Sequence, residues 1–290
     1  MKVAYIGLGS MGAPQARLIA RGGHELAVHD AVPAARDAFL GIARVAVSAG
    51  DAAEGAECAC VCVRDDQQVN EVVLGDTGLI EALAPGALIL VHSTVEVATL
   101  HRLQAQLEPR GIALVDAPVS RTRRTDDAAF VFTMLGGDDR DVERARKVVE
   151  TFSTDVDHVG PLGAGMAAKI ANNLVTWTHL VVASQATRLA AHYGVPYESL
   201  RRVMAANGNL TPTVAALLDG KHKSPPGANP THDQFLASQA GIGEKDLGLA
   251  IDCGEAASLS LAMISETRSL VRSVMTGALA QPTQGGKSRA

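Results

Sequence analysis

The sequence predicts an α/β fold in two parts, an N-terminal part in which strands and helices alternate and a second part built from helices alone. Three observations predict it. Short apolar runs typical of strands alternate with helical patterns up to about residue 160, a glycine-rich turn follows the first run, and the later residues show helical periodicity without clear strands. The expected domains are 1–162 and 163–280, followed by a disordered tail at 281–290.

The composition suits two globular domains and excludes several classes of partner. The chain has 290 residues, of which 47% are hydrophobic and 20% charged, enough apolar material for a sizeable core. A net charge of −5 gives no reason to expect nucleic acid or an anionic membrane as partner. The first residues begin a strand pattern without a signal peptide, and no uninterrupted apolar run is long enough to span a bilayer. We therefore expect a cytoplasmic protein.

The cysteines and histidines are expected to be structural. Cys58, Cys60 and Cys62 alternate along an apolar run, which places three thiols in line on one strand face. Metal sites usually need a turn between such close ligands, so we expect buried core thiols, no bound metal and no disulfide. Three lone histidines lie near predicted site elements and are given no role; they are His29, His92 and His179.

A glycine-rich turn lies between the first predicted strand, residues 2–6, and a helical pattern that ends at Gly22. Its sequence is Gly7-Leu8-Gly9-Ser10-Met11-Gly12. The first glycine permits a tight turn, the second lets the backbone approach a pyrophosphate, and the third allows helix and strand to pack closely. The helix N-terminus adds free N–H groups and the positive end of its dipole. The motif in this context predicts a Rossmann dinucleotide-binding domain in which all six residues contact the cofactor.

An acidic residue follows the second predicted strand, residues 24–28, where such folds bind ribose. Asp30 stands 18 positions after Gly12. A carboxylate there accepts hydrogen bonds from ribose hydroxyls and repels a 2′-phosphate. Residues 31–35 contain no arginine to hold that phosphate, and Arg36 already belongs to the next helical pattern. The sequence therefore predicts NAD rather than NADP as cofactor.

The alternation continues through several more predicted strands, which are 58–63, 87–91 and 112–115, with 130–135 and 156–159 completing the sheet. In an open α/β sheet, ligands bind beyond the carboxyl ends of the strands. Ser93, Thr94 and Ser120 are therefore expected near the cofactor or substrate. Val63, Arg64 and Thr94 are assigned to the cofactor. Ordinary capping of strand ends remains an alternative for each hydroxyl.

The second part begins with a glycine-rich turn and the longest predicted helix, 167–193. Lys169 and Asn173 are four residues apart, so both leave one helix face. A lysine in this small, apolar setting is a candidate proton donor and acceptor, because burial lowers the pKa of an amine. Further helices are expected at 197–206, 243–255 and 261–279, with a loop at 218–230.

At this point the chain resembles the β-hydroxyacid dehydrogenase family over residues 1 to about 280. Four sequence blocks of the family match this chain in the same order. They are Gly7-Leu-Gly-Ser-Met-Gly12, Asp116-Ala-Pro-Val-Ser120, Gly163-x-Gly165-x-x-x-Lys169-x-x-x-Asn173 and Lys245-Asp-Leu-Gly-Leu-Ala250. The resemblance implies an NAD-dependent oxidoreductase that acts on a 3-hydroxy acid or the matching semialdehyde. It also implies a homodimer or homotetramer that packs through the helical domain.

The resemblance also implies a role for individual residues. Lys169 would be the general acid and base, and Asn173 would hold the substrate. Ser120 and the residues just after it would receive the substrate carboxylate. Lys245 would lie close to both nicotinamide and substrate, with Asp246 ordering that segment.

One block departs from the family pattern. The family commonly has two glycines after the serine, where this chain has Arg121 and Thr122, followed by Arg123 and Arg124. A side chain at position 121 takes space and adds a fixed charge that can bind carboxylate or phosphate. We expect Arg121 to recognise an acidic group, which disfavours small substrates such as 3-hydroxyisobutyrate. The alternative is that these arginines face solvent and pair with Asp126 and its neighbour.

Two other functions are compatible with parts of the pattern. An imine reductase of the same architecture is one, but such enzymes often lack a lysine at the position of Lys169. A dinucleotide-binding regulator without turnover is the other. Lys169 disfavours the imine reductase, and Lys169, Asn173 and Lys245 together disfavour the regulator.

Overall fold

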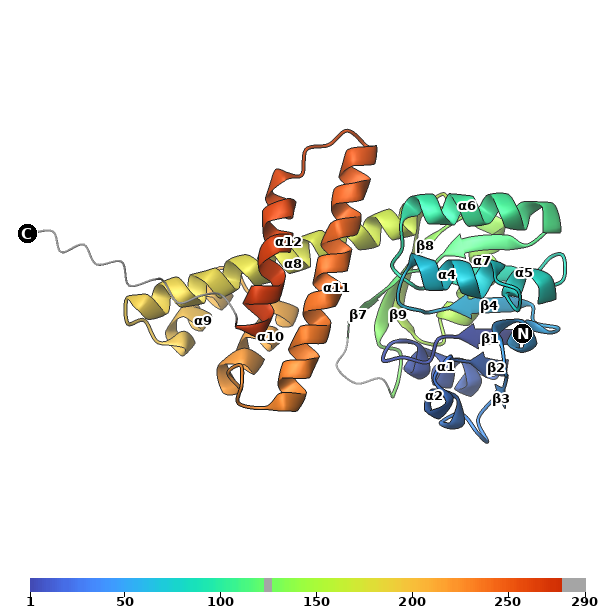
Figure 1. Ribbon diagram of the computed structural model, residues 1–290, viewed down its shortest axis with the longest axis horizontal. Helices are drawn as coiled ribbons and strands as arrows, with labels where there is room; N and C mark the ends of the chain where they lie inside the picture. Colours follow the sequence, from blue (N-terminus) through green and yellow to red (C-terminus); the bar gives the residue numbers. More distant parts are fainter. Residues whose placement is uncertain (123–126, 278–290) are drawn as a thin grey trace, which may run out of the picture. The chain divides into compact units, whose positions relative to one another are not determined.

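The computed structural model describes residues 1–122 and 127–277, which fall into two compact units, Met1–Lys169 and Ile170–Ala290 (Figure 1). Arg123, Arg124 and Asp126 lie outside the described residues, as does the expected tail at 281–290.

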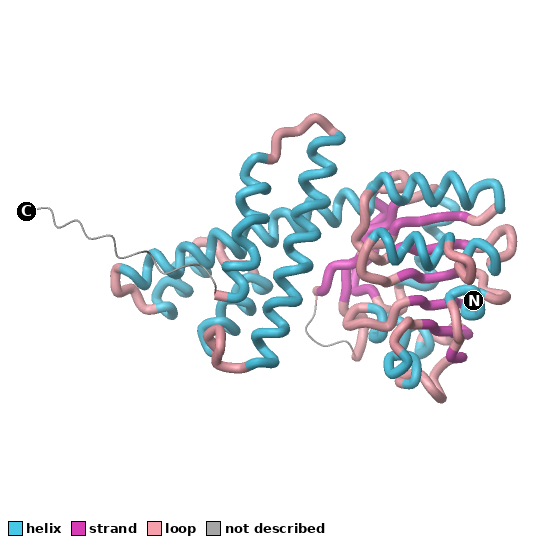
Figure 2. The backbone as a smooth tube through the Cα atoms, in the orientation of Figure 1, coloured by secondary structure: helices cyan, strands magenta, loops and turns pink. Residues whose placement is uncertain are grey.

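The first unit is built on one sheet, whose strands are magenta in Figure 2. The strand order is β3-β2-β1-β4-β5-β6-β8-β7, and β9 also pairs with β8. Neighbours from β3 to β6 are parallel, whereas β8 runs antiparallel to β6 and β7. The strands are β1 Lys2–Ile6, β2 Glu25–His29, β3 Arg44–Val45, β4 Cys58–Val61, β5 Leu88–Val91, β6 Ala113–Asp116, β7 Val119–Arg121, β8 Val131–Gly136 and β9 Ser153–Gly160. This arrangement confirms the predicted α/β class.

Helices connect the strands and cover the sheet. They are α1 Gly12–Arg21, α2 Pro33–Asp37, α3 Ala49–Ala53, α4 Asp66–Leu74, α5 Leu79–Ala82, α6 Val97–Leu107, the 3-10 turn η1 Glu108–Arg110 and α7 Asp139–Val149. Side chains of α1 and α7 share one buried cluster with the central strands, which includes Ile19, Val28, Val115 and Val148. A parallel sheet covered in this way needs strands that are apolar on both faces.

The cysteine strand is shorter than predicted. Strand β4 ends at Val61, so Cys62 lies just beyond it, while Cys58 and Cys60 are fully buried. None of the four cysteines forms a disulfide. Burial raises the pKa of Cys60 well above its ordinary value, because a thiolate would be desolvated there. Cys58 and Cys60 therefore act as small apolar core residues, as expected.

Two strands were not predicted, and both are short. Strand β3 pairs with β2 over two positions, Ala27 with Arg44 and Val28 with Val45. Strand β7 pairs with β8, so that Ser120 stands opposite Phe132. Ser120 was expected in the loop that follows a strand, whereas it lies within β7.

The second unit consists of helices, which confirms its predicted class. The long helix α8 spans Ala164–His192 and crosses from the first unit into the second, and it ends before Gly194-Val-Pro196 as predicted. The others are α9 Tyr197–Ala206, α10 Pro212–Lys223, α11 Pro230–Ala256 and α12 Ala262–Thr276. Helices α11 and α12 pack side by side (Figure 1). None of the helices within the described residues is long and apolar enough to cross a membrane.

The expected loop at 218–230 was wrong in its first half. Thr211 caps the N-terminus of α10, because its side chain accepts a hydrogen bond from the Val214 N–H. The helix then continues through Gly220 to Lys223. The ammonium of Lys221 donates to the Val274 carbonyl near the end of α12, which fixes this last turn. Helix α11 also begins earlier than expected, because Asn229 accepts from the first free N–H groups and Pro230 follows it.

His92 is a buried structural residue at the end of β5. Its ring nitrogen Nδ1 lies 2.8 Å from the Ala117 carbonyl oxygen, which makes Nδ1–H the donor. The ring stacks on Tyr5 and meets the edge of Phe152. Within the described residues Nε2 has no hydrogen-bond partner. A proton there would be a buried, unpaired charge, so burial lowers the pKa of His92 to about 4.

The first prediction follows from this histidine. In His92→Asn the amide can still donate to the Ala117 carbonyl, but the titrating ring is gone. The unfolded chain binds the histidine proton first, since the folded-state pKa lies below the ordinary 6.5. Stability from neutral His92 is therefore present above pH 6.5 and is lost between pH 6.5 and 4, at up to about 1.4 kcal/mol per pH unit.

Urea unfolding of wild type and His92→Asn across pH 7.5 to 4.5 measures this loss. The difference in unfolding free energy between the two proteins isolates the ring, because every other titrating group is common to both. We expect the unfolding free energy of the wild type, minus that of the variant, to decrease as the pH is lowered. A constant difference would contradict the assignment.

Candidate active site

The glycine-rich loop joins β1 to α1, and two of its glycines are demanded by the fold. Gly7 has φ +98, a left-handed conformation that favours glycine, and a Cβ there would overlap the carbonyl of Cys62. A Cβ on Gly12 would overlap the carbonyl oxygen of Gly7. These two glycines therefore let the start of α1 pack directly against the loop and its neighbouring strand.

Gly9 is different, because no atom of the described residues occupies the place where its side chain would be. Its φ is outside the left-handed region, and a Cβ there would meet no atom within 4 Å. The free space lies over an exposed backbone, with Ser10 exposed and Met11 half-buried beside it, while Leu8 is buried beneath the loop. A Cβ at this position would fill room that a pyrophosphate needs when it lies on the loop. The loop therefore fits a dinucleotide.

Asp30 follows β2 beside this loop. Its Oδ2 accepts from the Leu8 N–H at 2.6 Å, and its Oδ1 accepts from the Val32 N–H at 2.8 Å. The side chain is half-buried. The two backbone donors fix the carboxylate at the edge of the glycine loop, the place where ribose hydroxyls are recognised in such folds.

Strand order reverses between β1 and β4, which is the switch point where open α/β sheets bind ligands. After β4, the Val63 N–H donates to Ser93 Oγ at 2.8 Å, and the Arg64 N–H donates to Gln68 Oε1 at 3.0 Å. Thr94 is half-buried just after Ser93. The loops that follow β4 and β5 are thus tied together at the same edge as the glycine loop.

A buried carboxylate anchors the start of helix α8. Asp116, the last residue of β6, accepts from the Gly163 N–H at 2.7 Å and from the Met166 N–H at 2.6 Å. A Cβ on Gly165 would collide with the Met134 carbonyl and the Asp116 carboxylate. The Gly-x-Gly sequence is therefore needed for the helix to approach the sheet this closely. Burial raises the pKa of Asp116 to about 6, although the two N–H donors oppose that shift.

The anchored helix brings Lys169 to Ser120. The Lys169 ammonium group donates to Ser120 Oγ at 2.9 Å, across 49 positions of sequence. Ser120 lies in β7 and Lys169 at the second turn of α8, and both side chains are half-buried. An amine and a hydroxyl in contact at the carboxyl end of a sheet can hold and transfer a proton.

Arg121 lies on the opposite side of β7 from Ser120, because neighbouring residues of a strand point to opposite faces. Its Nη2 is 3.5 Å from the Ser10 carbonyl oxygen, and its guanidinium lies 4.7 Å from the centre of the Phe130 ring. Thr122 shares a hydrogen bond of 2.9 Å with Thr154 in β9. Arg121 is thus beside the glycine loop, and Thr122 is part of the sheet edge.

The second unit holds a polar cluster centred on Asp246, which is buried in α11. Its Oδ2 accepts from Asn173 Nδ2 at 2.7 Å and from the indole N–H of Trp177 at 3.3 Å. Lys245 Nζ lies 3.3 Å from Asp246 Oδ1. The carboxylate therefore sets the orientation of the Asn173 carboxamide, and its negative charge lies beside the Lys245 ammonium.

Two residues of these clusters were missed as contributors. Asp116 belongs to one of the matching blocks, but its contact with the start of α8 could not be predicted, because its partners lie 47 and 50 positions away. Trp177 was not singled out, although a lone tryptophan one helical turn after Asn173 was a visible signal.

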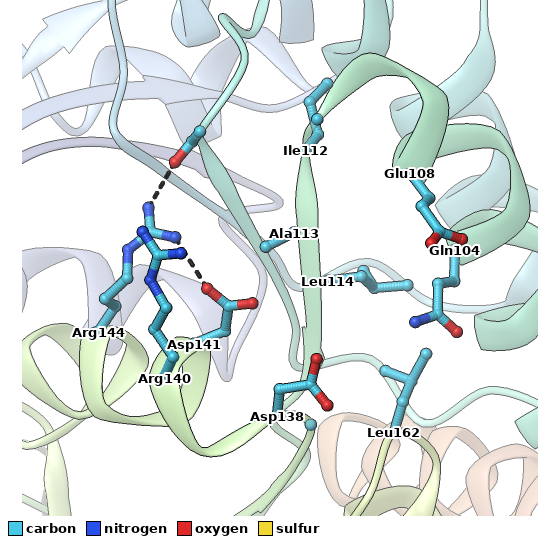
Figure 3. Close-up of a pocket in the computed structure, with 13 residues that line it drawn as sticks. Gln104, Glu108, Ile112, Ala113, Leu114, Asp138, Arg140, Asp141, Arg144 and Leu162 are labelled. Atoms are coloured by element: carbon cyan, nitrogen blue, oxygen red, sulfur yellow. Dashed lines mark hydrogen bonds and ion pairs between the residues drawn. The ribbon is translucent and has the colours of Figure 1, made fainter.

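An open cavity of about 500 Å³ in the first unit lies away from these residues (Figure 3). It opens because β6 and β8 share only the bridge between Asp116 and Gly136, so their other ends separate. Arg144 donates to the Gly86 carbonyl at 2.7 Å and pairs with Asp141 on its wall. None of the candidate site residues lines this cavity.

Comparison with protein families divides the chain into two matching regions. Residues 2–160 match the family described as the NAD binding domain of 6-phosphogluconate dehydrogenase. Residues 163–284 match the family described as NAD-binding of NADP-dependent 3-hydroxyisobutyrate dehydrogenase. The first of these matches alone covers more than half of the chain.

Similar proteins span almost the whole chain. An NAD-dependent L-serine dehydrogenase of Pseudomonas aeruginosa is 32% identical, over 98% of this chain and 99% of its own. A 3-hydroxyisobutyrate dehydrogenase of the same organism is 30% identical, over 92% and 90%. A solved Mycobacterium tuberculosis 3-hydroxyisobutyrate dehydrogenase with L-serine has a TM-score of 0.79 at 26% identity, over 96% and 99%.

Imine reductases share the fold at a greater distance. One from Myxococcus stipitatus, solved with NADP+, has a TM-score of 0.66 at 19% identity, over 96% of this chain and 95% of its own. At that identity the likeness concerns the fold alone.

The glycine loop yields a paired prediction. In Gly9→Ala the new methyl group enters open space, so we expect an unchanged melting temperature but NADH binding weakened about tenfold or more, because the methyl occupies the cofactor's room. In Gly12→Ala the methyl overlaps a backbone carbonyl, and we expect destabilisation of about 1–3 kcal/mol. Thermal melts and NADH fluorescence titrations measure both. A Gly9→Ala protein that binds NADH like wild type would rule out this account of the loop.

Proposed function

The chain belongs to the β-hydroxyacid dehydrogenase family, and from this premise we propose that it transfers a hydride between NAD and a 3-hydroxy acid with Lys169 as general acid and base. The observation that carries the proposal is the 2.9 Å hydrogen bond between Lys169 and Ser120, held by the Asp116 anchor of α8. L-Serine and 3-hydroxyisobutyrate, named for two relatives, are both 3-hydroxy acids and are the first substrates to test.

Lys169 would move the proton of the reacting hydroxyl. Bound NAD supplies the hydride acceptor when the alcohol is oxidised. In that direction the free amine of Lys169 takes the hydroxyl proton, and in the reverse direction its ammonium returns a proton to the forming alkoxide. Proton transfer by a positioned group of this kind typically contributes about 10²–10⁴-fold in rate.

Other residues would hold the substrate in place for that transfer. Ser120 accepts a hydrogen bond from Lys169 and would bind the substrate as well. Asn173 stands one helical turn after Lys169 in α8, with its carboxamide oriented by Asp246. We assign Ser120 and Asn173 to substrate binding, Lys245 to substrate and cofactor, and Asp246 to positioning. Fixed reactants react faster because orientation is prepared before the chemical step.

The cofactor would lie on the glycine loop. Residues 7–12 and Asp30 would hold its pyrophosphate and adenosine ribose, and the half-buried Val63 and Thr94 and the exposed Arg64 lie beyond neighbouring strands. Asp30, already fixed by two backbone N–H groups, would repel a 2′-phosphate. This arrangement supports NAD over NADP.

Lys169 is also the residue that separates this function from its rivals. Replacing Lys169 by alanine is expected to lower kcat about 10²–10⁴-fold on whichever 3-hydroxy acid the wild type oxidises. NADH binding should be retained, because Lys169 is not part of the glycine loop. NADH formation on a panel of L-serine, short hydroxy monoacids and hydroxy diacids measures the effect.

The control is Lys147→Ala, which removes a lysine from α7 and should leave kcat unchanged. If the wild type binds NADH yet oxidises no member of the panel, the result favours a dinucleotide-binding regulator without turnover. If Lys169→Ala keeps full activity, another group carries the proton.

We also propose that the chain forms a homodimer or homotetramer through its helical part. Val175, Val182 and Leu189 recur every seven residues on α8, and 63%, 53% and 63% of each is exposed. That spacing places them on one face of the helix, and an apolar stripe of this kind suits a second copy of the chain.

We also propose a cytoplasmic location, because four cysteines without a disulfide suit a reducing compartment.

A charge on that stripe should disrupt the assembly. Light scattering after size-exclusion chromatography is expected to show a dimer or tetramer for wild type and a smaller species for Val182→Glu. The matched control is Val47→Glu in the first unit, where valine is 81% exposed, and it should keep the wild-type mass. A monomeric wild type would refute the proposal.

A further inference from the structure

The Arg121 side chain is held in a definite place by contacts of its own. Arg121 ends β7, and Ser120 before it contacts Lys169. Since neighbouring strand residues face opposite sides, a guanidinium at 121 does not share the side of Ser120. The position argues for a partner other than the reacting end of the substrate.

The contacts of Arg121 run to the glycine loop. Nη2 lies 3.5 Å from the Ser10 carbonyl oxygen and 3.7 Å from Met11 Sδ. The guanidinium is held 4.7 Å from the centre of the Phe130 ring, which limits where the head group can go. Within residues 1–122 and 127–277 both polar contacts come from the same nitrogen, so a guanidinium with five N–H donors keeps capacity for a ligand.

The positive charge of Arg121 is also opposite to the charge of the pyrophosphate that the glycine loop would bind. Residues 7–12 contain no lysine or arginine, so apart from the Ser10 hydroxyl the loop offers a phosphate only backbone N–H groups and the helix dipole of α1. A dinucleotide brings a pyrophosphate with two negative charges to this backbone. Arginine binds phosphate oxygens in bidentate fashion, which lysine or a neutral donor does not reproduce.

We propose that Arg121 is a cofactor-binding residue that pairs with the pyrophosphate of NAD across the glycine loop. The inference deepens the proposed function and rests on it only in that the chain binds a dinucleotide. It gives a reason for the arginine at a position where the family commonly has glycine. The rival assignment, recognition of an acidic group on the substrate, makes a different prediction for binding.

The test is a cofactor-binding measurement that requires no turnover. NADH is titrated by fluorescence, and ADP-ribose by competition, against wild type, Arg121→Ala, Arg121→Lys and Arg140→Ala. ADP-ribose keeps the pyrophosphate but lacks nicotinamide. Arg140 is an exposed arginine on α7, so its replacement matches the change in net charge. Thermal melts check that each variant is folded.

We expect Arg121→Ala to weaken both NADH and ADP-ribose about tenfold, as the loss of one charge-assisted hydrogen bond does. Arg121→Lys should recover part of the affinity, and Arg140→Ala should bind like wild type. The dependence of NADH affinity on salt should be shallower in Arg121→Ala, because one ionic contact is gone.

Unchanged affinity of Arg121→Ala for NADH and ADP-ribose would overturn the proposal. If the KM for the hydroxy acid at saturating NAD rises at the same time, Arg121 is assigned to the substrate instead. Failure to oxidise any hydroxy acid would count against the proposed function alone, since these affinities are measured without substrate.

Discussion

The carboxylate of Asp116 is the contact on which the arrangement of the reacting groups depends. It joins the carboxyl end of β6 to the first N–H groups of α8, and the helix then carries Lys169 to Ser120. A helix N-terminus buried against a sheet would otherwise leave donors unsatisfied, at a cost of about 1–3 kcal/mol each. The same contact explains Gly165, which leaves the carboxylate room to reach the backbone. One buried charge thus sets both the start of the helix and the direction of its lysine.

The features that could be predicted from the sequence are those encoded locally. The three glycines of the cofactor loop and the acid after β2 are recognisable because the motif, strand and helix are contiguous. Lys169 and Asn173 could be paired because helix geometry alone places residues four apart on one face. The α/β class followed from the alternation of patterns, which needs no knowledge of tertiary contacts.

What escaped prediction depends on contacts between distant positions. Strand β7 exists because it pairs with β8, and a three-residue strand has too short a pattern to stand out. Helix α10 runs through Gly220, where the contact of Lys221 with the end of α12 outweighs the local preference for a loop. The direction of the Arg121 side chain could not be foreseen either, because it follows from the pairing of β7.

The buried thiols of β4 give this enzyme a built-in reporter of its own opening. Cys58 and Cys60 lie at the centre of the sheet with no exposed surface, and burial disfavours the reactive thiolate of Cys60. A thiol-directed reagent can reach them only when the strands around β4 separate. Their rate of labelling in the native protein therefore reports the opening of the sheet and not the local fraying of surface segments. Chemical modification can in this way rank ligands by how strongly they hold the cofactor domain closed.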